Sequence, residues 1–235
     1  MYNLSRRGFL FASSGAAAGT FMVTGFSEAK ENGKPSPSGL KSGQPKPLRY
    51  KSISGFLSAE QIAPHYSAHY GGALRGYMAA DNQLQNSIST GMAVEENAYG
   101  AIQRARTSKG NSVLLHELYF DGLAMKSDLS AQEVVKAIEK RFGSLDYWAA
   151  DFQASAKAAA GWAMLAFHPI NGNLYNVISD EHAIGVLWMA TPLVVIDVYE
   201  HAFYVDYKNR KTEYINKFMD HIDWHEVNRR YKNAS

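Results

Sequence analysis

Apolar residues between positions 58 and 125 recur at helical spacing. The segment Ser58-Ala59-Glu60-Gln61 is a typical helix start with Ser58 at the N-cap, and the helical pattern continues to about Ser89. A second helical pattern runs from about Glu95 to Met125, with Gly110-Asn111 as a candidate break. Two long helical patterns in succession predict an antiparallel helical hairpin over residues 51–127.

After residue 128 the pattern changes from two further helices to short apolar runs that are typical of strands. Helices are predicted from Ser130 to Phe142 and from Leu145 to Ala160, and strands at Gly161–Phe167, Leu174–Ser179 and Leu193–Asp197. Residues 169–173 read as the hairpin turn between the first two strands, and helices follow from Glu200. The chain is therefore predicted to be an α+β protein: an N-terminal helical hairpin, then a C-terminal domain (128–235) of helices around a small three-stranded antiparallel sheet.

The first fifty residues have no such pattern. Paired arginines, Arg6 and Arg7, precede a short apolar stretch from Ala12 to Phe26, which is typical of a twin-arginine export signal over residues 1–29. The alternative is a membrane anchor, but the stretch is short and diluted by Ser, Gly and Thr. Residues 30–50 are rich in Lys, Gly, Pro and Ser, which predicts a flexible linker.

The amino-acid composition excludes several kinds of functional site. The chain has no cysteine, which excludes disulfides, iron–sulfur clusters, thiolate zinc sites and a cysteine nucleophile. Any bound metal must therefore use the eight histidines together with Asp or Glu. The net charge of +2 comes from the first fifty residues, and the remainder is mildly acidic. A nucleic-acid partner is therefore not supported.

Three histidine arrangements are candidates for metal binding. His65 with His69, and His221 with His225, stand at i,i+4, which places two rings on one helix face. Such pairs are common on solvated faces without a metal. Asp197 ends an apolar strand and His201 follows four residues later, so the two form either a metal-binding pair or a buried Asp–His hydrogen bond.

The sequence segments around these residues resemble those of the iron/manganese superoxide dismutase family. Residues 197–207 read Asp-Val-Tyr-Glu-His-Ala-Phe-Tyr-Val-Asp-Tyr, similar to the family's Asp-x-Trp-Glu-His-Ala-Tyr-Tyr followed by Asp-Tyr. Thr191-Pro192-Leu193, Gly161-Trp162, residues 65–70 (His-Tyr-Ser-Ala-His-Tyr) and residues 115–120 (Leu-His-Glu-Leu-Tyr-Phe) also match family segments in order. The resemblance covers about residues 55–230.

The resemblance implies one iron ion per subunit, with manganese as the other candidate, and dismutation of superoxide as the reaction. Its metal ligands would be His65, His116, Asp197 and His201, which leave a fifth position open to solvent.

The resemblance also implies residues around the ligands. His69 would line the substrate channel and bond Tyr204 of the other subunit of a homodimer, and Glu200 would bond His201 across the same interface. His182, fifteen residues before Asp197, is the candidate donor to the metal-bound solvent; the alternative is a loop histidine displaced by a gap.

Three departures from the family pattern stand out. Ala73 occupies the position of the family's channel tyrosine, and Tyr77 is a candidate substitute. Ser112 stands at one of the two positions from which the family supplies a glutamine to the solvent. Tyr199 replaces the usual tryptophan.

Two other functions remain open at this point. One is a non-catalytic metal-binding protein of the same fold, and the other is a zinc hydrolase, which is disfavoured because no general base is evident near the ligands. With an export signal, the protein would fold and acquire its metal in the cytoplasm and act in the periplasm or outside the cell. No membrane span is expected in the mature form.

Overall fold

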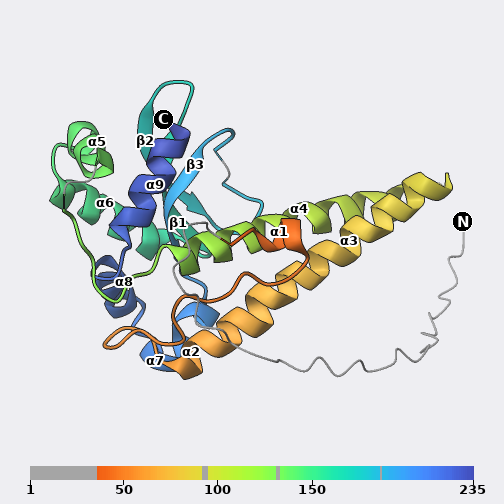
Figure 1. Ribbon diagram of the computed structural model, residues 1–235, viewed down its shortest axis with the longest axis horizontal. Helices are drawn as coiled ribbons and strands as arrows, with labels where there is room; N and C mark the ends of the chain where they lie inside the picture. Colours follow the sequence, from red (N-terminus) through yellow and green to blue (C-terminus); the bar gives the residue numbers. More distant parts are fainter. Residues whose placement is uncertain (1–35, 92–94, 131–132, 186) are drawn as a thin grey trace, which may run out of the picture.

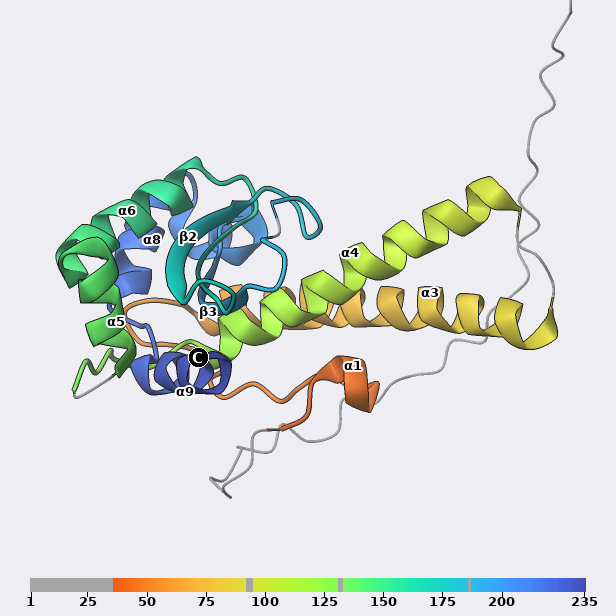
Figure 2. The same cartoon turned by 90° about the horizontal axis from the view of Figure 1, so that it is seen from above.

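The predicted helical hairpin is the most extended part of the protein (Figure 1). The computed structural model describes residues 36–91, 95–130, 133–185 and 187–235. Helix α2 (Ala59–Pro64), the π-helix η1 (His65–Tyr70) and α3 (Gly71–Thr90) follow one another directly, and α4 (Glu96–Asp121) returns beside them. The Ser58 hydroxyl accepts a hydrogen bond from the Gln61 amide, as expected of an N-cap. Figure 2 shows both helices reaching well beyond the rest of the molecule.

The candidate break at Gly110-Asn111 is wrong, because α4 is continuous through both residues. Gly110 is buried, and a Cβ atom added there would lie 3.2 Å from Cδ2 of Tyr77 on α3. The glycine therefore allows close packing of the two helices at this point.

The sheet has the three predicted strands, β1 (Trp162–His168), β2 (Asn173–Ser179) and β3 (Thr191–Asp197), all antiparallel in the order β2-β1-β3. The other helices are α5 (Glu133–Phe142), α6 (Leu145–Ala158), the 3-10 turn η2 (Glu200–Ala202), α7 (Tyr204–Tyr207), α8 (Lys211–Met219) and α9 (Trp224–Ala234). The register pairs Trp162 with Asp197, so the end of β3 is held beside the start of β1. The predicted α+β fold is confirmed.

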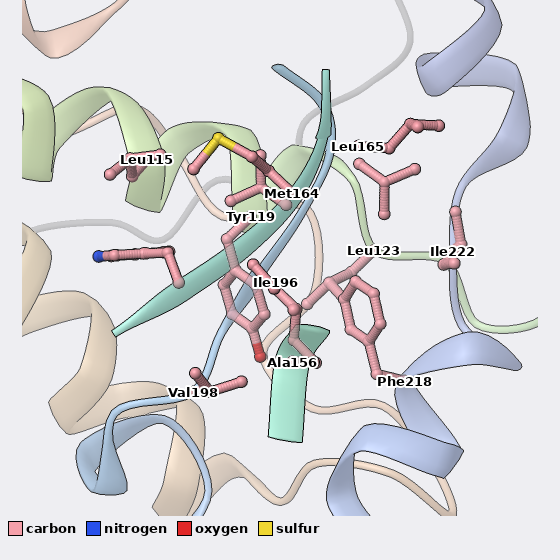
Figure 3. Packing of buried hydrophobic residues seen from close by; sticks show 14 of the residues in the cluster. Leu115, Tyr119, Leu123, Ala156, Met164, Leu165, Ile196, Val198, Phe218 and Ile222 are labelled. Atoms are coloured by element: carbon pink, nitrogen blue, oxygen red, sulfur yellow. The ribbon is translucent and has the colours of Figure 1, made fainter. Parts of the chain in front are cut away.

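One hydrophobic core joins the base of the hairpin to the sheet and the C-terminal helices. Tyr119 of α4, Leu165 of β1, Ile196 of β3 and Phe218 of α8 meet there, each with at most 1% of its surface exposed (Figure 3). Burial of this kind stabilises the fold by about 1.5–3 kcal/mol per large side chain. Because the apolar run of β3 is buried throughout this core, Asp197 at its end is buried as well, at 0% exposure.

The prediction of a flexible linker over residues 30–50 is wrong for residues 36–50, which we call the strap. The strap contains helix α1 (Gly39–Ser42), which is capped by the Ser38 hydroxyl, and Leu40, Leu48 and Tyr50 pack against the core. Their apolar side chains are spaced among prolines and glycines with no helical or strand period, so the sequence did not reveal that they are partly buried. Residues 30–35 and the predicted export signal lie outside the described residues.

Within the described parts of the chain, no helix has both the length and the apolar character needed to cross a membrane.

Candidate metal centre

Four side chains from four elements converge where the hairpin meets the sheet. His65 begins η1, His116 lies in α4, Asp197 ends β3 and His201 lies in η2. One ligand atom from each residue lies within 4.8 Å of all the others. His65, His116 and Asp197 are buried, while the His201 side chain keeps 21% of its surface exposed. The fold thus brings together residues that are up to 136 positions apart in the sequence.

The separations fit ligands of a single ion. Oδ2 of Asp197 lies 3.0 Å from Nε2 of His65, 3.2 Å from Nε2 of His201 and 3.7 Å from Nε2 of His116. Neighbouring ligand atoms that each lie about 2.1 Å from one metal are themselves about 3.0–3.6 Å apart. An ion can therefore be held by all four groups with only small adjustments of the His116 ring.

The state of His116 favours a metal over a simple Asp–His hydrogen bond. Its Nδ1 donates a hydrogen bond to the carbonyl oxygen of Ser112 at 2.7 Å, which places the proton on Nδ1. Its buried Nε2 then presents a lone pair that has no hydrogen-bond partner among the described residues. Buried polar atoms are rarely left unsatisfied, so this nitrogen, which lies within 4.8 Å of a ligand atom of each of the other three residues, fits a site for a cation.

The electrostatics of the site keep its ligands in the forms that bind metals. Burial by itself raises the pKa of Asp197, but hydrogen bonds from His201 and His65 hold that pKa well below its usual range. Burial lowers the pKa of His65, and it lowers the pKa of His116 to about 3. The site thus presents a carboxylate together with His65 and His116 as neutral imidazoles, donors suited to iron, manganese or zinc.

Comparison with known proteins assigns the chain to a family. Residues 130–230 match the model described as iron/manganese superoxide dismutases, C-terminal domain. The superoxide dismutase [Fe] of Aquifex aeolicus is 36% identical over 200 residues, which cover 81% of this chain and 92% of that protein.

The chain belongs to the iron/manganese superoxide dismutase family.

Relatives of both metal types are similar to the chain. Superoxide dismutase [Mn] 2 of Haloferax volcanii is 30% identical over 191 residues, covering 81% of this chain and 94% of that protein. The superoxide dismutase [Fe] of Cupriavidus metallidurans is 34% identical over 182 residues, covering 76% of this chain and 90% of that protein. The match and the four-residue cluster together support one iron or manganese ion.

His69 lies against the ligand set. Its ring stacks on that of His201 with centroids 3.7 Å apart and an angle of 11° between the planes. Burial lowers the pKa of His69 to about 4, and repulsion from His201 contributes. Glu200 and Tyr204 flank His201 in the sequence and are exposed, as His69 is. His69 therefore contacts His201, while Glu200 and Tyr204 are exposed residues close to it in the sequence.

His182 lies next to His116, with the two ring centroids 6.4 Å apart. The indole Nε1 of Trp162 donates a hydrogen bond to Nδ1 of His182 at 3.0 Å. Because Nδ1 accepts, the proton of the neutral ring is on Nε2, which makes that atom a donor. Asn111 also holds this loop, because its side-chain amide donates to the carbonyl oxygen of His182 at 2.8 Å.

The structure also locates the departures from the family pattern. Ala73 is buried with 4% of its surface exposed, and Tyr77 packs against Gly110, six residues before His116. The Tyr199 ring stacks on His201, with centroids 5.3 Å apart and a 14° angle between the planes.

The second i,i+4 pair, His221 and His225, takes no part in this site. His221 stacks on Phe56, with ring centroids 4.8 Å apart. His225 is exposed and pairs with Asp128 at 3.4 Å.

Sequence reasoning missed the structural role of Gln61. Its carboxamide is buried, donates to the carbonyl oxygen of His201 at 2.6 Å and accepts from the Val205 amide at 2.9 Å. Gln61 therefore fixes the turn that carries His201. Its position three residues after an N-cap explains the omission, because that spacing reads simply as part of a helix start.

Tyr214 holds the backbone at Asp197, the other candidate ligand in the C-terminal domain. Its hydroxyl donates to the carbonyl oxygen of Asp197 at 2.8 Å and lies 3.0 Å from the hydroxyl of Tyr119. This pair of buried tyrosines anchors the end of β3.

Proposed function

We propose that the protein is a superoxide dismutase that uses one iron or manganese ion per chain. The observation that carries the proposal is the convergence of His65, His116, Asp197 and His201 in a chain of this family. A bound iron or manganese ion would supply one-electron chemistry, taking an electron from one superoxide and giving it to a second. With two protons, the products are oxygen and hydrogen peroxide.

The residues of the chain prepare the site for this reaction. Asp197 remains a carboxylate because the surrounding imidazoles favour its charged form, so it offsets part of the positive charge of a bound ion. His182, whose ring lies near that of His116, offers the Nε2 proton that its bond from Trp162 specifies, and it would donate to an oxygen ligand of a bound ion and favour its anionic form. Hydrogen bonds of this kind tune which oxidation state is preferred, and with a histidine donor at His182 we propose iron as the ion.

We also propose that the protein acts as a homodimer. His69, Glu200 and Tyr204 are polar, exposed and close in sequence or space to His201. In a dimer through this face, Glu200 would bond His201 of the second copy, and His69 would bond its Tyr204. Such bonds would orient a ligand that is only half-buried in one chain.

Export is proposed from the sequence of residues 1–29, which lie outside the described residues. Arg6 and Arg7 ahead of a short apolar stretch support transport by the twin-arginine machinery. Because that route carries folded proteins, the metal would be acquired in the cytoplasm and the enzyme would act in the periplasm or outside the cell. Replacing both arginines by lysine should retain the protein in the cytoplasm; unchanged export would contradict the proposal.

The activity is tested by preparing the protein separately with iron, manganese and zinc, then measuring metal content and superoxide dismutation. We expect about one ion per chain in each case, with dismutation in the iron or manganese form and none in the zinc form. Bound iron or manganese without dismutation would instead support a non-catalytic metal protein. Light scattering on the same samples tests the dimer, and a monomer in solution would exclude it.

A further inference from the structure

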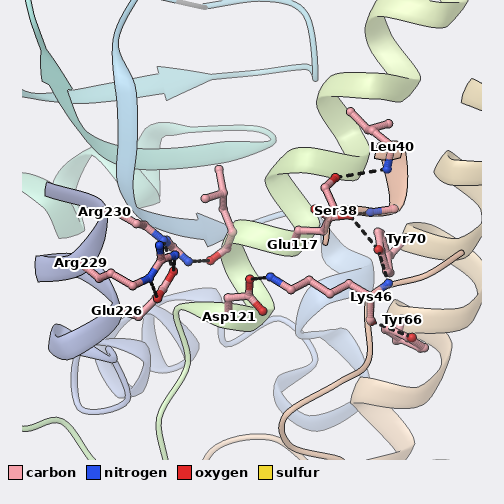
Figure 4. A network of polar contacts seen from close by, with 12 residues as sticks. Ser38, Leu40, Lys46, Tyr66, Tyr70, Glu117, Asp121, Glu226, Arg229 and Arg230 are labelled. Atoms are coloured by element: carbon pink, nitrogen blue, oxygen red, sulfur yellow. Dashed lines mark hydrogen bonds and ion pairs between the residues drawn. The ribbon is translucent and has the colours of Figure 1, made fainter. Parts of the chain in front are cut away.

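The strap (residues 36–50) binds the two helices that carry His65 and His116. Figure 4 shows Ser38 and Lys46 of the strap lying beside the side chains of Glu117 and Tyr70. The Gly39 amide donates to Oε1 of Glu117 at 2.7 Å, and the Lys46 amide donates to the Tyr70 hydroxyl at 2.7 Å. The Tyr66 hydroxyl donates back to the Lys46 carbonyl oxygen at 2.9 Å. The strap is therefore joined to both sides of the hairpin.

Glu117 is the centre of these contacts. Glu117 has only 7% of its surface exposed. Its Oε1 accepts a second hydrogen bond, from the Tyr70 hydroxyl at 2.9 Å. Burying a carboxyl group without partners is costly, and the strap supplies one of the two donors found here. Without the Gly39 amide, the buried carboxylate of Glu117 would keep only the Tyr70 hydroxyl as a donor.

Both partners are direct neighbours of residues at the metal centre. Glu117 follows His116 in α4, and Tyr70 follows His69 and closes the π-helix that begins at His65. The Tyr70 ring also lies against that of His116, with centroids 6.2 Å apart. A shift of the Glu117–Tyr70 bond would thus move the backbone and the ring that set the direction of His116.

The strap has little room to shift at Gly39. A Cβ atom there would lie 3.0 Å from the Tyr70 hydroxyl oxygen, 3.1 Å from the Gln44 carbonyl oxygen and 3.1 Å from Cδ2 of Leu74. A side chain at this position would require the strap or these neighbours to move by a few tenths of an ångström. Nearby, Lys46 also forms an ion pair with Asp121 at the end of α4.

We propose that Glu117, held by Gly39 and Tyr70, is a positioning residue for His116, so that the strap controls how tightly the metal is retained. The proposal rests on the metal centre and does not require dismutase activity. Supports of metal ligands of this kind change metal affinity by about 10–100-fold when they are removed.

The test uses the full chain loaded with iron and compares Glu117→Ala, Glu117→Gln, Gly39→Ala and the exposed control Lys41→Ala. We expect Glu117→Ala and Gly39→Ala to release iron into excess EDTA about 10-fold faster than the unsubstituted protein. Their high-spin iron(III) electron paramagnetic resonance spectra should also differ from it. Glu117→Gln keeps the acceptor oxygen and should restore both properties, and Lys41→Ala should alter neither.

Thermal unfolding separates positioning from simple stabilisation. If Glu117→Ala and Gly39→Ala unfold at lower temperature but keep the original release rate and spectrum, the strap is only structural and the proposal is overturned. It is equally overturned if Glu117→Gln releases iron as fast as Glu117→Ala. Absence of dismutation in the unsubstituted, iron-loaded protein would count against the proposed function. The strap proposal is decided separately, by the iron-release rates and spectra of the variants.

Discussion

The hairpin and the sheet hold their metal ligands by different means. Asp197 ends a buried strand that pairs with β1, and its carbonyl oxygen accepts a bond from Tyr214. His65 and His116 instead stand on helices whose far halves project into solvent (Figures 1 and 2). On the sheet side, the position of the ligand follows from the strand ladder and the core. On the hairpin side it depends on individual contacts, such as the carbonyl oxygen of Ser112.

The candidate metal centre lies at the junction of two structural units, so its set of ligands is complete only when both units are packed together. Neither unit has enough ligands alone, since the hairpin supplies two imidazoles and the C-terminal domain supplies one imidazole and one carboxylate. The junction is also where the exposed hairpin gains its burial, with Val113 and Tyr119 both at 0% exposure.

The largest loss of metal affinity is expected on the sheet side of this junction, at Asp197. Asp197→Asn keeps the shape of the side chain but removes its charge, so metal affinity should fall by more than about 100-fold, beyond the range typical of supporting residues. Dismutation should then drop to background. Metal analysis and activity of this variant are compared with Asp146→Asn, which changes an exposed carboxylate in α6. Normal metal content in Asp197→Asn would show that the carboxylate is dispensable.

A smaller loss is expected from His182→Ala, which removes a donor without removing a ligand. The variant should retain its metal, while dismutation should fall by about 10–100-fold because the hydrogen bond that tunes the site is gone. His225→Ala, at an exposed and distant position, is the control. Full activity in His182→Ala would contradict the assigned role, and loss of metal would show that His182 supports the ligands instead.

Acid should destabilise the metal-free protein, because unfolding allows His116 of the hairpin to be protonated. The folded pKa of His116 is about 3, below the ordinary value of 6.5, so the unfolded chain binds the proton more readily. Stability from this group is therefore present above about pH 6.5 and is lost as the pH falls toward about 3, by about 1.4 kcal/mol per pH unit. Urea unfolding should show a loss of about 2 kcal/mol between about pH 7.5 and pH 5. His116→Asn should reduce this slope, and a slope equal to that of the unsubstituted protein would show that other groups cause it.

The smallest effect is expected far along the hairpin. Ile88 near the end of α3 is 70% exposed, so Ile88→Ser should change the free energy of unfolding by less than about 0.5 kcal/mol. Val113→Ala at the buried base removes two methyl groups and should cost about 1–3 kcal/mol by comparison. Urea unfolding measures both. Equal effects would mean that the exposed end of the hairpin is stabilised by contacts similar to those at its base.

Sequence periodicity was sufficient for most of the secondary structure. The helical hairpin, the three strands and the turn at residues 169–173 were all predicted, because amphipathic helices and buried strands leave regular apolar patterns. The continuous helix at Gly110 and the ordered strap were missed. In both cases the local residues, a glycine and a Pro-rich segment, normally interrupt structure, and only contacts with distant residues override that tendency.

Sequence alone indicated the family and, through that resemblance, four candidate ligands, because the segments around His65, His116, Asp197 and His201 match family segments in type and order. Which residues support these side chains was visible only in the folded chain. Gln61 binding the turn at His201, Trp162 setting the proton position of His182, and Gly39 reaching Glu117 all join residues that are far apart in the chain. Hydrogen bonds of this kind depend on distances of about 3 Å between elements, and these distances are set when the hairpin, the sheet and the strap pack together.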